Sequence, residues 1–334
     1  MSSTPTFTIT TEITNLVAEI SEKIGQIQGA KAYERNLHLR KVNRLRSVQS
    51  STAIEGNSLS LEQITDVING RRIIGNPREI REVRNAYDAY EHALALNPYK
   101  VSDFLHAHKM MTTDLVDEAG KFRSGNVGVF SGKKVVHIGA KPEYLLSLMT
   151  DLFKWAKSTK EHPLIKSAIM HFEIEFIHPF ADGNGRMGRL WQTLVLSTWQ
   201  PVFAWIPVET IVYENQAEYY AVLGRAEKTA DSTEFIEFIL SAILRAINEL
   251  SNITEIIPEK ITGLLTKTQR DFLANIIGFI QTNGEIDNYR AQLLTNKSGE
   301  MTKKLLAALV ANGVLIATGR TKGRKYKLNP DLNK

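Results

Sequence analysis

Apolar residues recur every three to four positions along most of the chain, which is the spacing of an amphipathic helix. Near the N-terminus this stripe consists of Ile13, Leu16, Val17, Ile20 and Ile24. The same spacing predicts further helices at residues 33–48, 78–90, 101–115, 145–157, 163–177, 209–223 and 235–250. We therefore predict that the chain up to about residue 257 is a mainly α-helical bundle.

One segment in this helical part has a different pattern. Two β-prone runs within residues 127–138 flank Ser131-Gly132-Lys133, which predicts a β-hairpin. In a two-stranded hairpin each strand pairs with only one neighbour, so its outer edge has backbone groups that are not paired with another strand. Such an edge is suited to accept an extended segment of another protein. A hairpin without a functional role is the alternative.

The last part of the chain, residues 258–334, shows a third pattern. Its periodicity predicts helices at 268–282, 290–294 and 298–310, followed by strands at 314–318 and 324–328. Three helices and a hairpin in this order predict a small winged-helix domain.

Charge separates this segment from the rest. Residues 258–334 hold 13 Lys and Arg against 6 Asp and Glu, whereas the remainder holds 28 against 30. The candidates for contacts with a DNA phosphate backbone are Lys303, Lys304, Arg320, Lys322, Arg324 and Lys325. Because winged helices also bind proteins, the sequence leaves open whether residues 258–334 contact DNA.

Composition limits the class of protein. A chain of 334 residues is longer than a typical domain with one hydrophobic core, which predicts a main domain and a smaller one. Its 43% hydrophobic and 23% charged residues are ordinary for a globular protein. The absence of cysteine excludes disulfides and thiolate metal sites. No apolar run approaches the ~18 residues of a membrane span, and no secretory signal is evident. We expect a cytoplasmic protein without membrane contact.

The chemistry concentrates in residues 178–189, His-Pro-Phe-Ala-Asp-Gly-Asn-Gly-Arg-Met-Gly-Arg, which precede a helix-compatible apolar run. A tight turn at Gly183-Asn184-Gly185 would direct backbone N–H groups outward from the start of that helix, which is the geometry of an anion site. Arg186 and Arg189 lie three residues apart and project from one side of the first turn. Two guanidinium groups beside such a turn favour a polyphosphate over a single carboxylate.

Two other side chains complete this segment. Asp182 is out of place near so much positive charge unless a divalent cation, Mg2+, lies between it and the phosphates. His178 is the natural acceptor of a hydroxyl proton, because histidine titrates near neutrality. The alternative is a helix–loop–helix corner that carries a surface charge cluster.

At these residues the sequence resembles the Fic family, whose motif is His-Pro-Phe-x-Asp/Glu-Gly-Asn-Gly-Arg-x-x-Arg, and every specified position matches. The resemblance implies transfer of AMP from ATP to a protein hydroxyl, with His178 as general base and Asp182 as Mg2+ ligand. It also implies that the α- and β-phosphates are bound by Gly183, Asn184, Gly185 and Arg186. Arg189 would then reach the γ-phosphate.

A second segment, Ser51-Thr-Ala-Ile-Glu55-Gly56-Asn57, has two interpretations. By itself it is a helix that ends at Gly56 and carries a solvated glutamate. Beside the motif it resembles the Fic inhibitory helix, in which Glu55 pairs with Arg189, occupies the space of the γ-phosphate and is held in place by Ser51. Whether Glu55 also supports removal of AMP is left open.

The same resemblance extends to other parts of the chain. It makes the predicted hairpin the flap that positions a target protein, and it places Asn215, Tyr219 and Tyr220 beside the nucleotide. The predicted organisation is a helical region at 1–110 with the inhibitory helix at about 45–57, a Fic core at 111–257 with the flap at about 127–138, and the winged helix.

The leading hypothesis from the sequence is therefore an autoinhibited protein adenylyltransferase. One alternative is a nucleotide-sensing DNA-binding regulator, which a steep salt dependence of duplex binding, lost on deleting residues 258–334, would favour. Another is transfer of UMP or of a phosphate group, because the motif specifies the phosphate site better than the base. Self-AMPylation and a homodimer are left open.

Overall fold

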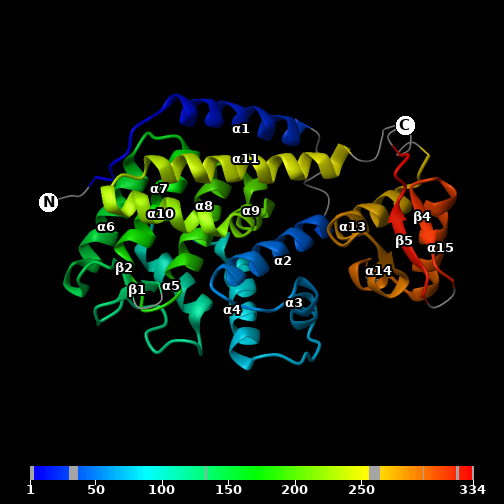
Figure 1. The fold of residues 1–334 in the computed structure, drawn as a ribbon, viewed down its shortest axis with the longest axis horizontal. Coiled ribbons are helices and arrows are strands. Elements are labelled where there is room, and N and C mark those ends of the chain that lie inside the picture. The colour runs from blue at the N-terminus through cyan, green and yellow to red at the C-terminus, as the bar shows by residue number, and fades with distance from the viewer. Residues whose placement is uncertain are drawn as a thin grey trace. The chain divides into compact units, whose positions relative to one another are not determined.

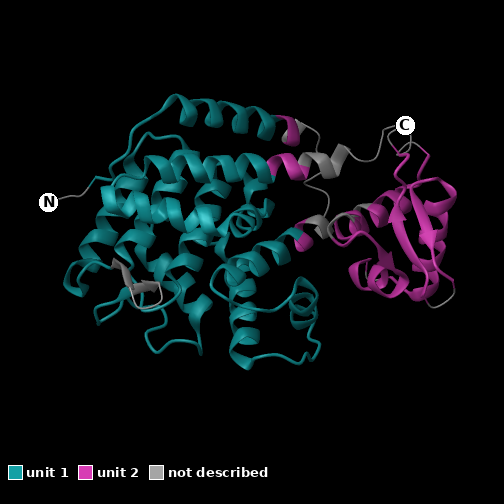
Figure 2. Ribbon diagram, viewed as in Figure 1, with its two compact units in different colours: residues 1–25, 43–246 teal, residues 26–42, 247–334 magenta. Residues whose placement is uncertain are grey.

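The computed structural model describes residues 4–29, 37–131, 134–255, 264–295, 297–320 and 323–332. The chain divides into two compact units, one of residues 1–25 and 43–246 and the other of residues 26–42 and 247–334 (Figure 2). The predicted boundaries at residues 110 and 257 remain predictions. No helix in the described ranges is long and apolar enough to cross a membrane.

The chain is mainly helical, as predicted (Figure 1). Its helical elements up to residue 255 are, in order, α1 (Thr11–Gly29), α2 (Leu37–Ile54), α3 (Leu61–Ile68), α4 (Pro77–Ala93), α5 (Val101–Thr112), α6 (Pro142–Ser158), α7 (Pro163–Ile177), α8 (Asn184–Trp199), η1 (Pro201–Trp205), α9 (Val208–Glu214), α10 (Gln216–Thr229) and α11 (Thr233–Glu255). The helix predicted at residues 33–48 corresponds to α2 from Leu37 onward, and residues 33–36 lie outside the described ranges. The single helix predicted at 209–223 is wrong, because the chain breaks at Asn215 between α9 and α10.

Helices α7 and α8 form the centre of the first unit. They approach closely at Gly188, where a Cβ atom would lie 2.6 Å from Cδ2 of His171. Trp191 of α8 is fully buried and donates a hydrogen bond from its indole nitrogen to Pro98 O at 3.0 Å. Figure 1 shows α1 running alongside α11, and Thr10 before α1 donates to Glu237 Oε1 of α11 at 2.6 Å.

The predicted hairpin is present. Strands β1 (Gly128–Ser131) and β2 (Lys134–Ile138) pair antiparallel, with Gly128 opposite Ile138 and an irregularity in register between Val129 and Phe130. The predicted turn residues Gly132 and Lys133 lie outside the described residues.

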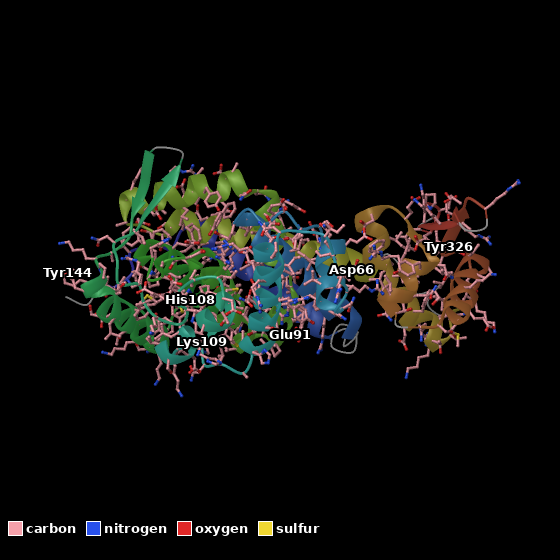
Figure 3. All side chains as sticks on the ribbon, turned by 90° about the horizontal axis from the view of Figure 1, so that it is seen from below. Asp66, Glu91, His108, Lys109, Tyr144 and Tyr326 are labelled. Atoms are coloured by element: carbon pink, nitrogen blue, oxygen red, sulfur yellow. The ribbon has the colours of Figure 1, made fainter. Side chains whose placement is uncertain are left out.

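The second unit contains α13 (Lys267–Asn283), β3 (Ile286–Asp287), α14 (Asn288–Thr295), α15 (Gly299–Ala311), β4 (Leu315–Thr318) and β5 (Lys325–Leu328). The three strands form an antiparallel sheet in the order β3–β5–β4. Tyr326 of β5, labelled in Figure 3, is buried in the apolar core of this unit. The order of helices and strands agrees with the prediction, and the winged-helix assignment itself remains a prediction.

The basic candidates in this unit differ in their contacts. Lys304 pairs with Glu300 at 2.8 Å, and Lys325 pairs with Glu285. Arg320 and Arg324 are exposed, whereas Lys322 lies outside the described residues. Two of the six predicted phosphate contacts are thus already engaged by carboxylates.

Candidate active site

The loop of residues 178–183 joins α7 to α8 through two left-handed backbone conformations. His178 ends α7 with φ 52°, and Gly183 precedes α8 with φ 89°. Such a conformation is strained for a residue with a Cβ atom, so His178 requires support from its surroundings. Its backbone N–H donates to Ile174 O at 3.0 Å, and its carbonyl accepts from Arg123 Nε at 2.8 Å.

Arg123 is a buried residue that holds this loop in place. Besides His178 O, its guanidinium donates to Gly125 O at 2.7 Å and to Ala140 O. Burial lowers the pKa of Arg123. Since Gly125 precedes β1 and Ala140 follows β2, one side chain ties both ends of the hairpin to the backbone of His178. This role of Arg123 was not predicted. Its position in the Gly120-Lys-Phe-Arg123 run, just before the β-prone segment, is the sequence feature that could have indicated it.

The ring of His178 has a defined tautomer. Its Nδ1 lies 3.2 Å from Glu175 O. Because a carbonyl oxygen can only accept, Nδ1 carries the proton of the neutral ring and Nε2 keeps its lone pair. A ring held in this way is suited to accept a proton at Nε2.

Asn184 stabilises the loop of residues 178–183 through two side-chain hydrogen bonds to the backbone of one residue. Its Oδ1 accepts from Phe180 N and its Nδ2 donates to Phe180 O, both at 2.9 Å. The ring of Phe180 stacks on His108, with centroids 3.6 Å apart. The side chain of Asn184 therefore shapes the loop, and the part of this residue in binding phosphate remains a prediction.

His108, labelled in Figure 3, holds the same loop from α5. Its Nδ1 accepts from Gly120 N at 3.0 Å, so its Nε2–H donates to Asp182 O at 3.0 Å. Burial lowers the pKa of His108 to about 4, so the ring stays neutral at physiological pH.

The start of α8 has the features of an anion site. Among the described residues no side chain caps this helix, so the N–H groups of its first turn face outward at the positive end of the helix dipole. Gly185 lies in this turn, where a Cβ atom would be 2.4 Å from Glu55 Oε1. The carboxylate of Glu55 thus covers the backbone that was predicted to bind phosphate.

The two arginines of this turn are both buried and both ion-paired. Arg189 Nη2 donates to Glu55 Oε1 at 2.6 Å, which is the contact predicted from the sequence. Burial alone would lower the pKa of Arg189, but the neighbouring Glu55 holds it above its ordinary value. Arg186 donates from Nη1 to Glu82 Oε1 at 2.5 Å and from Nη2 to Asp182 Oδ1 at 2.6 Å.

Both guanidinium groups still have unused donors. Arg186 Nε and Arg189 Nη1 are buried, and neither has a hydrogen-bond partner within the described part of the chain. A buried donor without a partner costs free energy, which a bound anion would recover. These atoms therefore support an anion site independently of the helix terminus.

Ser51 differs from its predicted role. Its hydroxyl accepts from Arg189 Nε at 3.1 Å, and its carbonyl accepts from Arg189 Nη2 at 2.9 Å. Ser51 thus holds the arginine, whereas it was expected to hold Glu55. Gly56 follows α2 with φ 93°, a left-handed conformation that suits glycine and ends the helix after Ile54.

Asp182 lies at the outer edge of the site with 41% of its side chain exposed. Besides Arg186, its carboxylate lies 3.6 Å from Arg78 Nη2. No group of three or more potential metal ligands occurs in the described ranges. A single accessible carboxylate fits Mg2+ that is shared with phosphate oxygens, and it does not fit a metal held by protein ligands alone.

Behind Arg189 lies a buried polar network on α7, α8 and α10. Tyr219 OH lies 3.2 Å from Glu175 Oε1 and 3.1 Å from His171 Nε2, and His171 Nδ1 lies 2.6 Å from Gln192 Oε1. Burial, with the charge of Glu55 as a second cause, raises the pKa of Glu175 to about 7. Burial lowers the pKa of His171 to about 3.

This network accounts for one of the three residues predicted to contact the nucleotide base. Tyr219 is fully buried, so its ring is covered by protein. Tyr220 is 46% exposed, and its hydroxyl donates to Ile54 O at 3.2 Å. Asn215 donates from its side chain to Ile211 O at 2.7 Å. Of these three residues, Tyr219 is buried, Asn215 is half-buried and Tyr220 is exposed.

Known proteins share this sequence and this fold. A sequence model of the Fic/DOC family matches residues 98–196, which include the whole 178–189 segment. The protein adenylyltransferase fic-1 of Caenorhabditis briggsae is 31% identical, over 58% of this chain and 38% of its own length. The protein adenylyltransferase Fic of Nematostella vectensis is 27% identical, over 63% of this chain and 49% of its own length. The chain thus matches half or less of these curated relatives.

A solved structure extends the match to the whole chain. A Fic family protein from Desulfovibrio desulfuricans is 40% identical, covers 98% of this chain and 99% of its own, and superposes with a TM-score of 0.74. Fic-1 from Caenorhabditis elegans, residues 134–508, shares the fold at 23% identity and a TM-score of 0.60. With a full-length relative at this identity, and with every specified motif position present, the chain belongs to the Fic family.

Proposed function

We propose that this protein is an adenylyltransferase that transfers AMP from ATP to a hydroxyl group of a protein. The observation that carries the proposal is the pair of buried, unpartnered nitrogens of Arg186 and Arg189 beside the uncapped start of α8. These donors are suited to a polyphosphate. The curated relatives named protein adenylyltransferase support ATP as its source.

The proposed reaction needs little beyond positioning and charge. The target hydroxyl gives its proton to His178 Nε2 as its oxygen attacks the α-phosphorus of ATP. A new O–P bond forms, the bond from the α-phosphorus to the bridging oxygen breaks, and pyrophosphate leaves. Arg123 fixes the backbone of His178 and Glu175 O fixes its imidazole ring, which together keep the acceptor atom in place.

The proposed nucleotide complex includes Mg2+. Asp182 would hold the ion together with phosphate oxygens, and the ion would neutralise charge on those oxygens. For this, the carboxylate of Asp182 must turn away from Arg186, which its partial exposure permits.

Two further features belong to the proposal. Glu55 inhibits the enzyme, because its carboxylate occupies both Arg189 and the surface of Gly185 that the phosphates need. The hairpin of β1 and β2 receives the target protein along its free strand edge, because its ends are anchored to the backbone of His178 through Arg123.

Labelling with isotopically marked nucleotides tests this function. In a Glu55→Gly background, we expect α-labelled ATP to mark protein and γ-labelled ATP to leave it unmarked. His178→Ala should abolish the label, because it removes the proposed acceptor of the hydroxyl proton, while nucleotide binding persists. Full activity of His178→Ala would refute the base, labelling from the γ-position would indicate phosphate transfer, and stronger labelling from UTP would indicate UMP.

A further inference from the structure

Arg186 is held by a carboxylate that lies outside the motif. Glu82 of α4 accepts from Arg186 Nη1 at 2.5 Å, 104 positions away in the sequence. The side chain of Arg186 is 5% exposed and that of Glu82 is 14% exposed. Burial raises the pKa of the Glu82 carboxyl, and Arg186 opposes that shift by favouring the charged form. The pair is therefore a partly desolvated contact, in which geometry and hydrogen bonding matter more than in a surface ion pair.

Glu82 is itself held by the segment that carries Glu55. Asn57 Nδ2 donates to Glu82 Oε2 at 2.8 Å and to Glu79 O at 3.1 Å, while Asn57 Oδ1 accepts from Leu59 N at 3.1 Å. A backbone N–H can only donate and a carbonyl can only accept, so these contacts fix the orientation of the amide. Asn57 is buried, and its contacts place Glu82 in one position.

The two carboxylates on Arg186 differ in their freedom. Asp182 is 41% exposed and, under the proposed function, turns toward Mg2+. Glu82 is covered and stays on Nη1. When Asp182 leaves, Glu82 is the contact that keeps the guanidinium in its plane, with Nε and Nη2 available to a phosphate oxygen.

We propose that Glu82, oriented by Asn57, is the positioning residue that holds Arg186 for the phosphates of the nucleotide. This inference rests on the proposed function and extends it to residues outside the motif. It also assigns residues 51–57 two opposite effects. Glu55 blocks the phosphate site, whereas Ser51 and Asn57 hold the two arginines that build it.

The consequence concerns activation. Removal of the Glu55 carboxylate frees Arg189 and leaves Arg186 fixed. Withdrawal of the whole segment would also release Asn57, and with it Glu82 and Arg186. Activation therefore proceeds by a local movement of Glu55 while the end of α2 stays packed, as the burial of Ser50, Ser51 and Thr52 indicates.

Nucleotide binding in the Glu55→Gly background tests the proposal. We expect Glu82→Gln to weaken ADP binding about tenfold, measured by calorimetry with Mg2+, and to leave adenosine binding unchanged. Asn57→Ala should act in the same direction with a smaller effect, and Glu82→Asp should restore part of the loss. Glu143→Gln is the control, because it makes the same chemical change at an exposed glutamate in the first turn of α6.

The outcomes separate the two hypotheses. Equal or tighter ADP binding by Glu82→Gln would overturn the positioning role, since tighter binding would mean that Glu82 competes with phosphate. An equal loss of adenosine binding would show a general structural defect and would also overturn it. Failure of the Glu55→Gly parent to bind either ligand would sink the proposed function itself, and this inference with it. Thermal unfolding of each variant confirms that it is folded.

Discussion

Two carboxyl groups lie near Arg189 and Gly185, and they differ in how they are held. Glu55, just after α2, makes the direct ion pair and keeps 28% of its side chain exposed. Glu175, in the last turn of α7, is 9% exposed and contacts the hydroxyl of fully buried Tyr219. A Cβ atom on Gly185 would lie within 3.0 Å of both carboxyl groups.

Burial explains why the two groups have different roles. Glu55 is partly exposed, so its carboxylate can turn toward solvent once an anion replaces it on buried Arg189. It is therefore suited both to block the site and to leave it. Glu175 has no such path, and desolvation raises its pKa until it holds a proton near neutral pH. The same side-chain chemistry therefore supplies a movable carboxylate, the proposed inhibitor, and a fixed carboxyl group that supports the core.

Removal of the movable partner should have the largest effect. We expect Glu55→Gly to raise self-labelling by α-labelled ATP about ten- to a hundredfold, because the phosphate site loses a competing buried ion pair. Glu143→Gly, which removes an exposed glutamate from the first turn of α6, is the matched control and should change nothing. An unchanged or lower rate in Glu55→Gly would contradict the inhibitory role.

The fixed partner should be visible as a dependence of stability on pH. Glu175 titrates at about 7 when folded and near its ordinary 4.5 when unfolded, so between these values only the folded state binds the proton. The free energy of unfolding should therefore fall as pH rises from 4.5 to 7, by on the order of 2 kcal/mol from this group.

Glu175→Gln isolates this contribution. The variant lacks the titrating group, so the difference in unfolding free energy between it and the wild type should change across pH 5 to 7 and level off above pH 7. Chemical denaturation at several pH values measures it, and the difference cancels the contribution of Glu173, whose pKa burial also raises to about 7. A difference that is constant with pH would show that Glu175 is charged throughout.

The smallest effect on activity should come from removing the hydroxyl group of Tyr219, which is fully buried. Tyr219→Phe removes only a buried hydroxyl, so we expect a loss of about 1 kcal/mol in stability and no change in the KM for ATP. A marked rise in KM would show that Tyr219 contacts the nucleotide, as its place in the sequence predicted. Tyr220→Ala is the informative comparison, because that ring is accessible.

Local sequence patterns predicted much of this structure. Helical periodicity identified most helices, two β-prone runs identified the hairpin, and the motif identified the loop around His178. Each of these features depends on residues close together in the chain. The pairing of Glu55 with Arg189 came from a resemblance, since 134 positions separate the two residues. Contacts without such a precedent were missed.

The missed contacts share a physical reason. Arg123 and Glu82 act through hydrogen bonds to groups that are far away in the sequence, and a charged residue is by default expected to be exposed. The burial of Tyr219 was missed as well, because a pair of adjacent tyrosines does not indicate which ring faces inward. Burial, which depends on the packing of several helices, decided each of these cases.

Arg123 connects both ends of the hairpin to the loop of residues 178–183 through hydrogen bonds from one side chain. Since one guanidinium joins Gly125, Ala140 and the carbonyl of His178, the distance from the roots of the hairpin to the imidazole is set independently of the sequence between those roots. Under the proposed function, substitutions along the two strands would change which target protein binds the hairpin and would leave the position of His178 unaltered. Such an arrangement would allow new target proteins to be acquired while the reaction is preserved.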